Sequence, residues 1–256
     1  MRFDFTSYIL IIKSLRRKKM RSFLTSLGII IGISSVLIIM SVGKGAESLV
    51  VNQIEGIGSD LIAILPGAAD DEGPPASAMG LVITTLTDGD TKAIVKRVPE
   101  IEVAASYLRG VASVTWQNKT DDTSFLGITA NYLAVESTET IKGRFINQEE
   151  EDQTAKVVVL GYSVAEDLFS NNNPLGEKVK VNKESFRVIG VMEERGVVGF
   201  QNQDDQVFVP LTTAQKILMG VNHVSFVRAK PKAGSDPRFV IEQTKQVLRD
   251  QHGIND

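Results

Sequence analysis

The feature that most constrains this chain is one long segment without charge. Residues 22–43 hold no Asp, Glu, Lys or Arg, and eleven of these 22 residues are Ile, Leu or Val. At a helical rise of about 1.5 Å per residue the segment is about 33 Å long, against roughly 30 Å for the hydrocarbon core of a membrane. The aliphatic residues favour insertion by roughly 3 to 7 kcal/mol before the polar residues subtract. We therefore predict a transmembrane helix over residues 22–43.

A buried soluble helix and a cleaved signal peptide are the two alternatives to a membrane anchor. A helix buried in a soluble core can be as apolar, although it rarely reaches this length without a charge. A signal peptide has a shorter apolar region, usually of about 7 to 15 residues. Ser41 and Gly43 form a tolerable small-x-small cleavage pattern. We favour an uncleaved membrane anchor, because the apolar run is long and follows an extended basic lead.

The flanking charges predict the orientation of this helix. Residues 1–21 carry seven of the 28 Lys and Arg residues but one of the 31 acids, so residues 44–256 carry 21 basic and 30 acidic residues. Cytoplasmic flanks of membrane helices are enriched in Lys and Arg. We expect a protein of the cell (inner) membrane with a cytoplasmic N-terminus and an acidic, extracytoplasmic main domain.

The basic lead itself has helical periodicity. Apolar residues recur on one side of residues 1–21, which predicts a cytoplasmic amphipathic basic helix lying in the membrane interface. Next to a spanning helix, anionic lipid head groups are better partners for its basic residues than nucleic acid is. The residues assigned to lipid contact and topology are Arg16, Arg17, Lys18, Lys19 and Arg21.

Small residues line one face of the predicted span. Thr25, Gly28, Gly32 and Ser35 are spaced by three, four and three residues, which places them along one stripe of a helix. Such a stripe lets a second membrane helix approach closely, and we predict that it packs against another helix. The alternative is that glycine is simply common in membrane helices.

Beyond the span, the periodicity predicts a stalk helix over residues 44–58 and then an α+β domain. A strand at 61–65, a helix at 87–98 and a strand at 103–108 form a predicted βαβ unit. Near the C-terminus a strand at 224–229 precedes an amphipathic helix at 236–251. We expect a further strand beyond Asp256 to complete a second unit. The inner side of the last helix is predicted to hold Phe239, Val240, Thr244, Val247 and Leu248.

The middle of the chain has a different character. β-rich runs, short helices and polar turns alternate over residues 111–220, including hairpins around residues 118–122 and 182–183. We interpret this region as a mainly β subdomain inserted into an α/β subdomain made from residues 59–110 and 221–256.

No residue pattern predicts catalysis. The chain has no cysteine and no GxxxxGK[ST] motif, so we expect neither thiol chemistry nor ATP binding by this chain. His223 and His252 have no partners at metal-ligand spacing, and the acidic runs at 70–72, 149–152 and 204–205 do not match an EF-hand. We interpret those runs as solvated turns and Trp116 as strand packing. No catalytic residue, cofactor or metal is assigned.

Several segments resemble a known family in their sequence and order. Residues 17–32 and 41–45 resemble the first membrane helix of MacB-like and FtsX-like ABC transporter permeases. The rest resembles the MacB-type extracytoplasmic core domain through residues 125–128 with 131–132, and through residues 142–145, 157–161, 168–169, 174–176, 186–191 and 207–211. The resemblance covers nearly the whole chain.

The resemblance implies a porter-like α/β subdomain, an inserted mainly β subdomain, and an ATPase that is either a partner subunit or a fused domain. We expect ATP to bind a separate ATPase subunit. It also implies further membrane helices after the outer domain, so we expect the chain to be a fragment or a truncated permease. Implied partners are an ABC ATPase, a second permease copy or homodimer, membrane lipids and an envelope or efflux protein.

Two functions follow from the resemblance. In the first, a permease subunit relays ATP-driven motion to its outer domain and expels peptides, antibiotics or lipid-linked cargo. In the second, a single-pass adaptor of FtsX-like type binds or regulates a cell-envelope protein. The loops at 67–80 and 196–206 are candidates for cargo contact, and their shape does not follow from the sequence.

Overall fold

The computed structural model describes residues 19–56, 61–67, 83–170, 172–198 and 201–254. Two units divide the chain, one ending at Glu55 and the other running from Gly56 to the C-terminus. The predicted amphipathic helix lies outside the described residues except for its last three positions, and so does most of the predicted loop at 67–80.

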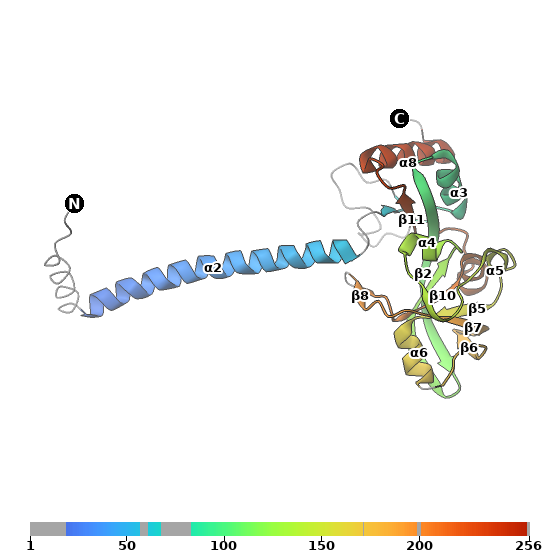
Figure 1. The fold of residues 1–256 in the computed structure, drawn as a ribbon, viewed down its shortest axis with the longest axis horizontal. Coiled ribbons are helices and arrows are strands. Elements are labelled where there is room, and N and C mark those ends of the chain that lie inside the picture. Colours follow the sequence, from blue (N-terminus) through green and yellow to red (C-terminus); the bar gives the residue numbers. More distant parts are fainter. Residues whose placement is uncertain (1–18, 57–60, 68–82, 171, 199–200, 255–256) are drawn as a thin grey trace. The chain divides into compact units, whose positions relative to one another are not determined.

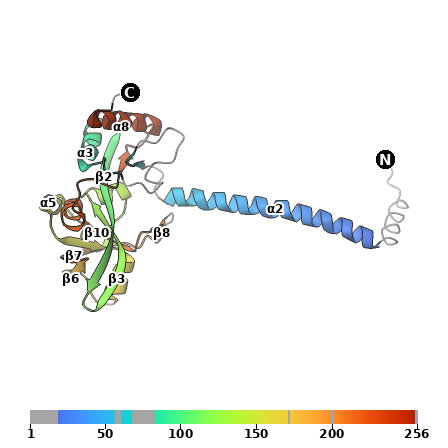
Figure 2. The same ribbon diagram turned by 180° about the vertical axis from the view of Figure 1, so that it is seen from behind.

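The first unit contains one continuous helix, α2 (Lys19–Gly56), of 38 residues (Figures 1 and 2). Its length is about 57 Å at 1.5 Å per residue. The predicted span at 22–43 lies within it, and the helix continues without interruption into the predicted stalk as far as Gly56. Glycines within the span do not break the helix.

The second unit is built on a mixed β-sheet with helices packed against it (Figure 1). Its strands are β1 (Ile62–Ile64), β2 (Ile101–Trp116), β3 (Lys119–Ile128), β4 (Thr140–Gly143), β5 (Val157–Leu160), β6 (Lys178–Val181), β7 (Glu184–Met192), β10 (Gln206–Pro210) and β11 (Phe226–Pro231). A separate two-stranded hairpin consists of β8 (Val197–Val198) and β9 (Gln201–Asn202).

The helices of this unit are short except at the C-terminus. They are α3 (Asp88–Arg97), α4 (Tyr132–Glu136), α5 (Gln148–Asp152), α6 (Tyr162–Phe169), α7 (Leu211–Thr213) and α8 (Pro237–His252), and the π-helix η2 (Ala214–Met219) directly follows α7. Helix α3 begins where the sequence predicts, because the backbone N–H of Thr87 donates to the carboxylate of Asp90.

The predicted βαβ unit is present with one strand inserted. Strand β11 pairs antiparallel with both β1 and β2. Strands β1 and β2 are therefore parallel to each other but not adjacent, which is the split form of a βαβ unit. The sequence pattern did not indicate this insertion, because β11 follows β2 by about a hundred residues.

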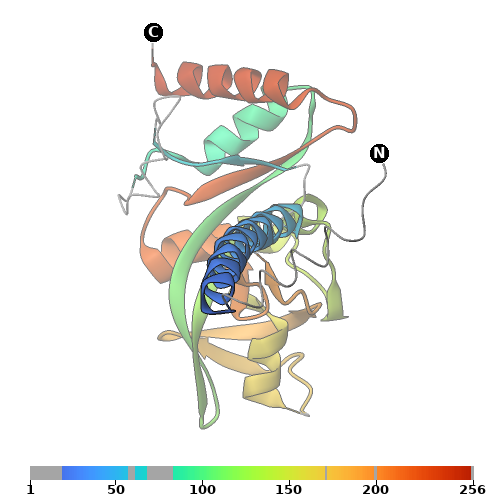
Figure 3. The same ribbon diagram turned by 90° about the vertical axis from the view of Figure 1, so that its left-hand side faces the viewer.

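Strand β2 joins the two regions that the sequence pattern separates. It pairs with β11 near its start, with β3 along most of its length and with β6 near its end. Figure 3 shows it as the long strand that runs from beside α3 and α8 to the hairpin tip. The division into a porter-like and an inserted subdomain stays a prediction, since β2 passes through the proposed boundary at residue 110.

Six strands close into a ring. The pairings run from β2 through β3, β10, β5 and β7 to β6, and β6 pairs again with β2. Each strand of the ring pairs on both sides, whereas β1 and β4 lie outside the ring and each pair with one strand. The hairpin turn between β2 and β3 is tighter than predicted, because Trp116 already pairs with Lys119 and the acidic residues 121–122 lie in β3.

The two faces of β2 belong to two different hydrophobic clusters. Ala104 and Leu108 pack in a cluster with residues of α3, α8 and the ring strands, whereas Ala105 and Tyr107 pack in another with residues of α4. This alternation follows from the period of two in a β-strand. The sheet therefore separates a core under α3 and α8 from an aromatic core under α4.

Three local predictions are wrong. Asp204 of the acidic run at 204–205 does not lie in a solvated turn, because it is buried and its carboxylate accepts the backbone N–H groups of Arg195 and Gly196. Phe239 is half exposed instead of facing the core, whereas Val240, Thr244 and Val247 are buried. The acidic run at 149–152 is not a solvated turn, because it belongs to helix α5 and Glu151 is buried. A capping interaction between Asn147 and the N–H of Glu150 starts this helix.

A glycine in strand β7 gives a test of this packing. A Cβ added to Gly190 would overlap the backbone carbonyl oxygen of Arg144, whereas one added to Gly89 in α3 meets only ordinary contacts. We predict that Gly190→Ala lowers the free energy of unfolding by about 1–3 kcal/mol or more. Gly89→Ala should be neutral or stabilising by up to about 1 kcal/mol. Denaturation followed by Trp116 fluorescence measures both, and equal effects would contradict the register of β7.

Candidate functional site

Helix α2 presents an apolar surface along its span. The 19 residues Phe23–Ser41 are long and apolar enough to cross a membrane, and none of that stretch is buried. Leu24, Ile30 and Ile39 are each more than half exposed. Backbone groups are satisfied within a helix, so a lipid environment is compatible with this segment.

The predicted stripe of small residues lies on this helix. The hydroxyl groups of Thr25 and Ser35 donate to the carbonyl oxygens of Arg21 and Ile31, at 2.6 and 2.7 Å. A Cβ added to Gly28 or Gly32 would meet nothing within 4 Å. The side chains of the stripe are therefore small, and the two hydroxyl groups already donate their protons to carbonyl oxygens of the same helix. Its packing against a second helix stays a prediction.

The basic residues proposed for lipid contact are only partly described. Lys19 is the first residue of α2, and Arg21 is exposed one turn before Thr25. Arg16, Arg17 and Lys18 lie outside the described residues. Lipid contact by this set stays a prediction.

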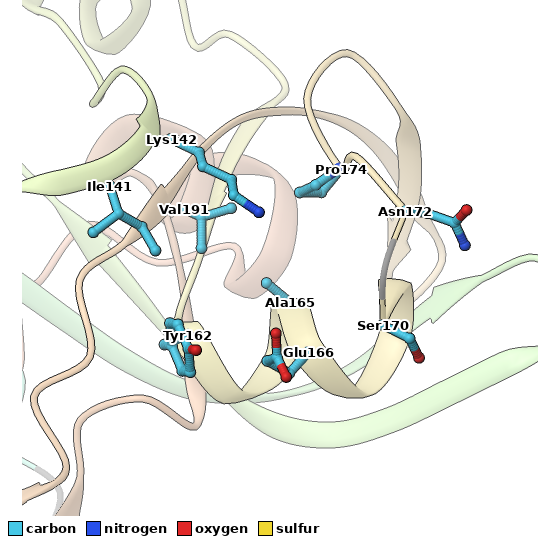
Figure 4. A pocket seen from close by; sticks show the side chains of 9 residues that line it. All are labelled: Ile141, Lys142, Tyr162, Ala165, Glu166, Ser170, Asn172, Pro174 and Val191. Carbon is cyan, nitrogen blue, oxygen red and sulfur yellow. The ribbon is translucent and has the colours of Figure 1, made fainter.

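A small recess lies between β4, β7, α6 and the turn before β6 (Figure 4). Its volume is about 20 Å³, which is room for little more than one water molecule. Lys142 and Glu166 contribute charged side chains to its wall, and Val191 contributes an apolar one. The recess is too small to hold an antibiotic or a lipid, so it does not identify a cargo.

The most connected polar cluster centres on Glu136, a residue that no sequence pattern singled out. Its side chain is 3% exposed at the end of α4. The carboxylate oxygen Oε1 accepts a hydrogen bond from the Tyr107 hydroxyl at 2.6 Å and another from Arg228 at 2.7 Å. Arg195 lies farther away, with Nη1 at 3.9 Å from Oε2. Segments of β2, α4, β11 and the chain before β8 therefore meet at one carboxylate.

Aromatic rings surround this ionic cluster. Tyr107 stacks on Phe226 with ring centroids 4.6 Å apart, and the Arg228 guanidinium lies 5.7 and 5.5 Å from the centres of these two rings. Burial raises the pKa of Tyr107 well above its usual value, and the neighbouring Glu136 raises it further. The hydroxyl therefore stays protonated at neutral pH and can donate to Glu136.

One signal in the sequence could have pointed to this cluster. Arg228 lies in a predicted strand two positions after Phe226, so both side chains share a face of the strand. A charged residue on the same face as an aromatic core residue requires a partner. The partner itself could not be found, because Glu136 is 92 residues away in sequence.

Trp116 and His252 make contacts that stabilise the fold. Trp116 packs on Phe169 at a centroid distance of 4.2 Å, as strand packing predicts. The Nε2 atom of His252 lies 3.1 Å from the carboxylate of Asp90 and links α8 to α3. Among the described residues, no group of three or more His, Asp or Glu side chains is arranged to hold a metal.

The chain combines an α+β domain with an apolar helix of membrane-spanning length. This combination is typical of membrane-anchored proteins with a folded outer domain. Residues 22–247 match the family model of the MacB-like periplasmic core domain. The chain belongs to this family, and it is a MacB-like ABC transporter permease chain that carries the periplasmic core domain.

Individual relatives agree with the family. The chain is 32% identical over 242 residues to the macrolide export ATP-binding/permease protein MacB of Bdellovibrio bacteriovorus, covering 94% of this chain and 37% of that protein. It is 35% identical over 248 residues to MacB of Azoarcus sp. strain BH72, and this match covers 96% of this chain and 36% of that protein. The chain thus spans little more than a third of the length of these curated relatives.

Solved structures show the same fold. The periplasmic region of MacB from Actinobacillus actinomycetemcomitans matches with a TM-score of 0.66 and 25% identity, over 78% of this chain and 87% of that one. The extracellular domain of the noncanonic ABC-type transporter YknZ from Gram-positive bacteria matches with a TM-score of 0.63 and 19% identity. This match covers 76% of this chain and 96% of that one. At 19% identity the second match shows the fold alone.

The hydrogen bond from Tyr107 to Glu136 gives a second test. Tyr107→Phe keeps the stacked ring but leaves a buried carboxylate without one donor, so we predict a loss of about 1.5–3 kcal/mol in the free energy of unfolding. Tyr162→Phe is the matched control, because Tyr162 is only partly buried and its change should stay within about 0.5 kcal/mol. Chemical denaturation measures both variants. A Tyr107→Phe effect no larger than the control would contradict the contribution of this bond.

Proposed function

We propose that this chain acts as the permease part of a MacB-like ABC transporter. In this proposal, a partner ATPase binds and hydrolyses ATP in the cytoplasm, and its motion passes through helix α2 to the outer domain. The relayed motion exports peptides, antibiotics or lipid-linked cargo. One observation carries the proposal: a domain with the fold of the MacB periplasmic region shares a chain with an apolar helix of membrane-spanning length, none of which is buried.

The proposed position of ATP rests on what the sequence contains. Two similar proteins are named as ATP-binding/permease proteins. The 256 residues of this chain contain no GxxxxGK[ST] phosphate-binding motif. We therefore place nucleotide binding outside these 256 residues, on an ABC ATPase that is either a partner subunit or a fused domain, with the permease part as the element that moves.

The proposed orientation has a cytoplasmic N-terminus and an outer domain on the far side of the inner membrane. Seven basic residues before the span support this orientation through the positive-inside rule. Their attraction to anionic lipids would hold the start of α2 at the cytoplasmic surface.

Pairing of two permease chains is proposed through the small-residue stripe. Gly28 and Gly32 have open space in place of side chains, so a second α2 helix could approach their backbone closely. In this arrangement α2 contacts a second permease helix rather than lipid along that face.

One experiment distinguishes the permease function from the alternative adaptor function. The tagged full chain is expressed in its host and purified from membranes in mild detergent, and ATP hydrolysis by the purified material is measured. The permease proposal predicts a co-purifying ABC ATPase whose activity elutes with the chain. An outer-domain partner retained without any ATPase would contradict the permease proposal and favour the adaptor.

A substitution pair tests the pairing face. The chain has no native cysteine, so Met20→Cys at the exposed start of α2 gives a unique site for cross-linking two copies with a bismaleimide. We predict that adding Gly28→Leu and Gly32→Leu reduces the yield of cross-linked dimer several-fold, because bulky side chains separate the helices.

The matched control uses small residues on the other side of the same helix. Ser34→Leu and Ser41→Leu add two leucines on the side of the helix away from the stripe, so they should leave the dimer yield unchanged. Unchanged dimer in the glycine variant, or equal losses in both variants, would contradict pairing through the stripe.

A further inference from the structure

The end of the β2–β3 hairpin is joined to helix α6. The Lys119 ammonium group donates to the carbonyl oxygen of Asp167 at 2.9 Å and to the hydroxyl group of Ser170 at 3.0 Å. The rings of Trp116 and Phe169 pack together, with their centroids 4.2 Å apart. One ammonium group and one aromatic pair therefore hold the hairpin against the C-terminal end of α6.

An acidic side chain lies on the same face of the hairpin. Lys119, Asp121 and Thr123 are alternate residues of β3, so their side chains share the face that meets α6. Asp121 Oδ2 is buried and has no hydrogen-bond partner among the described residues, and the same is true of Thr123 Oγ1. Thr123 is only 9% exposed. A buried carboxylate oxygen that no donor contacts is costly while the group carries a charge.

The charges around Asp121 make its ionisation still less favourable. Asp167 lies on α6, Asp205 precedes β10, and Asp122 is the next residue of β3. Burial raises the pKa of Asp121 above its usual value, and the charges of Asp205, Asp167 and Asp122 raise it further. The residue of β2 paired with Asp121 is Val114, which carries no charge. The contact between the hairpin and α6 thus contains a carboxylate that a proton would stabilise.

We propose that the contact between the hairpin and α6 is an acid-sensitive latch that tightens when Asp121 takes up a proton. The proton removes the charge at the buried Oδ2 atom and the repulsion from Asp167, while the bonds of Lys119 to α6 remain. At neutral pH Asp121 is charged and α6 opens more easily. The latch does not depend on which ATPase or cargo the chain uses.

The direction of the pH effect follows from the linkage between proton binding and folding. Because the pKa of Asp121 is higher in the folded chain than in the unfolded chain, the folded chain binds more protons between the two values. The stabilisation is complete below the unfolded pKa, about 3.9, and is lost as the pH rises through the folded pKa. Glu150 has the opposite effect, because the hydrogen bond from Arg144 lowers its pKa. The test therefore compares matched variants at α6 instead of the stability of the whole domain.

The experiment measures hydrogen exchange at the backbone amides of residues 119–124 and 166–170 in the full chain in lipid nanodiscs, at about pH 7 and about pH 4. Exchange rates are converted to protection factors, which removes the intrinsic pH dependence of exchange. Asp121→Asn keeps the shape of the side chain and removes its charge. At about pH 7 we expect its protection factors to exceed those of the unmodified chain by about twofold or more, and at about pH 4 this ratio should fall toward one.

Two further variants show that the measurement reports the latch. Lys119→Met removes the bonds to α6, so protection of residues 166–170 should fall at both pH values. Glu166→Gln is the matched control, because it removes an exposed carboxylate from the same helix and should leave the pH response of the unmodified chain unchanged.

A direct titration carries the test if Asp121→Asn does not fold. Carbon-13 NMR of the Asp121 carboxyl group should give a midpoint above that of aspartate in an unstructured peptide, and the amide signals of residues 166–170 should shift with the same midpoint. A ratio of protection factors that is equal at both pH values, or a midpoint at or below the peptide value, would overturn the proposal. Unchanged protection of residues 166–170 in Lys119→Met would overturn it as well.

Discussion

The structure depends first on removing one exposed apolar helix from water. Along Phe23–Ser41 no residue is buried, and Val36 and Leu37 are each more than half exposed. A soluble protein rarely exposes an apolar surface of this extent. A bilayer covers such a surface, and the helix satisfies its own backbone hydrogen bonds there. This requirement makes the folded unit after Gly56 a membrane-anchored domain.

Within that domain, the long hairpin of β2 and β3 organises the packing. Strand β2 contributes to the split βαβ unit at one end and to the ring of strands at the other. Because its alternate residues enter two different cores, displacement of β2 would disturb both. A relay of motion from a membrane helix requires a domain whose parts move together, and a shared strand provides such a connection. The Glu136 cluster adds a polar connection across the same region.

Local signals in the sequence were sufficient for many individual elements. The helix predicted at 87–98 is α3 (Asp88–Arg97), and the hairpin predicted around 182–183 is formed by β6 and β7. The uncharged run at 22–43 indicated the long helix α2. These elements follow from capping, turn chemistry and periodicity, all of which act over a few residues.

The sequence was not sufficient where distant residues decide the outcome. The position of β11 between β1 and β2 depends on pairing across the whole domain. Helix α5 looked like a solvated acidic turn, because nothing local shows that Glu151 accepts the backbone N–H of Ala130. Glu136 was missed for the same reason, since Tyr107 and Arg228 reach it from other strands. Buried polar groups are recognised by their partners, and the partners are set by the fold.

The proposed function requires that α2 cross the inner membrane and hold the core domain outside the cytoplasm. The absence of native cysteines allows single cysteines at Met20 and Val197, both largely exposed, to be compared with a membrane-impermeant maleimide on spheroplasts or protoplasts. This topology predicts that Val197→Cys is labelled on intact spheroplasts or protoplasts, whereas Met20→Cys is labelled only after the membrane is disrupted. If Met20→Cys is labelled on intact spheroplasts or protoplasts and Val197→Cys is not, the orientation is the opposite one and the proposed topology is overturned.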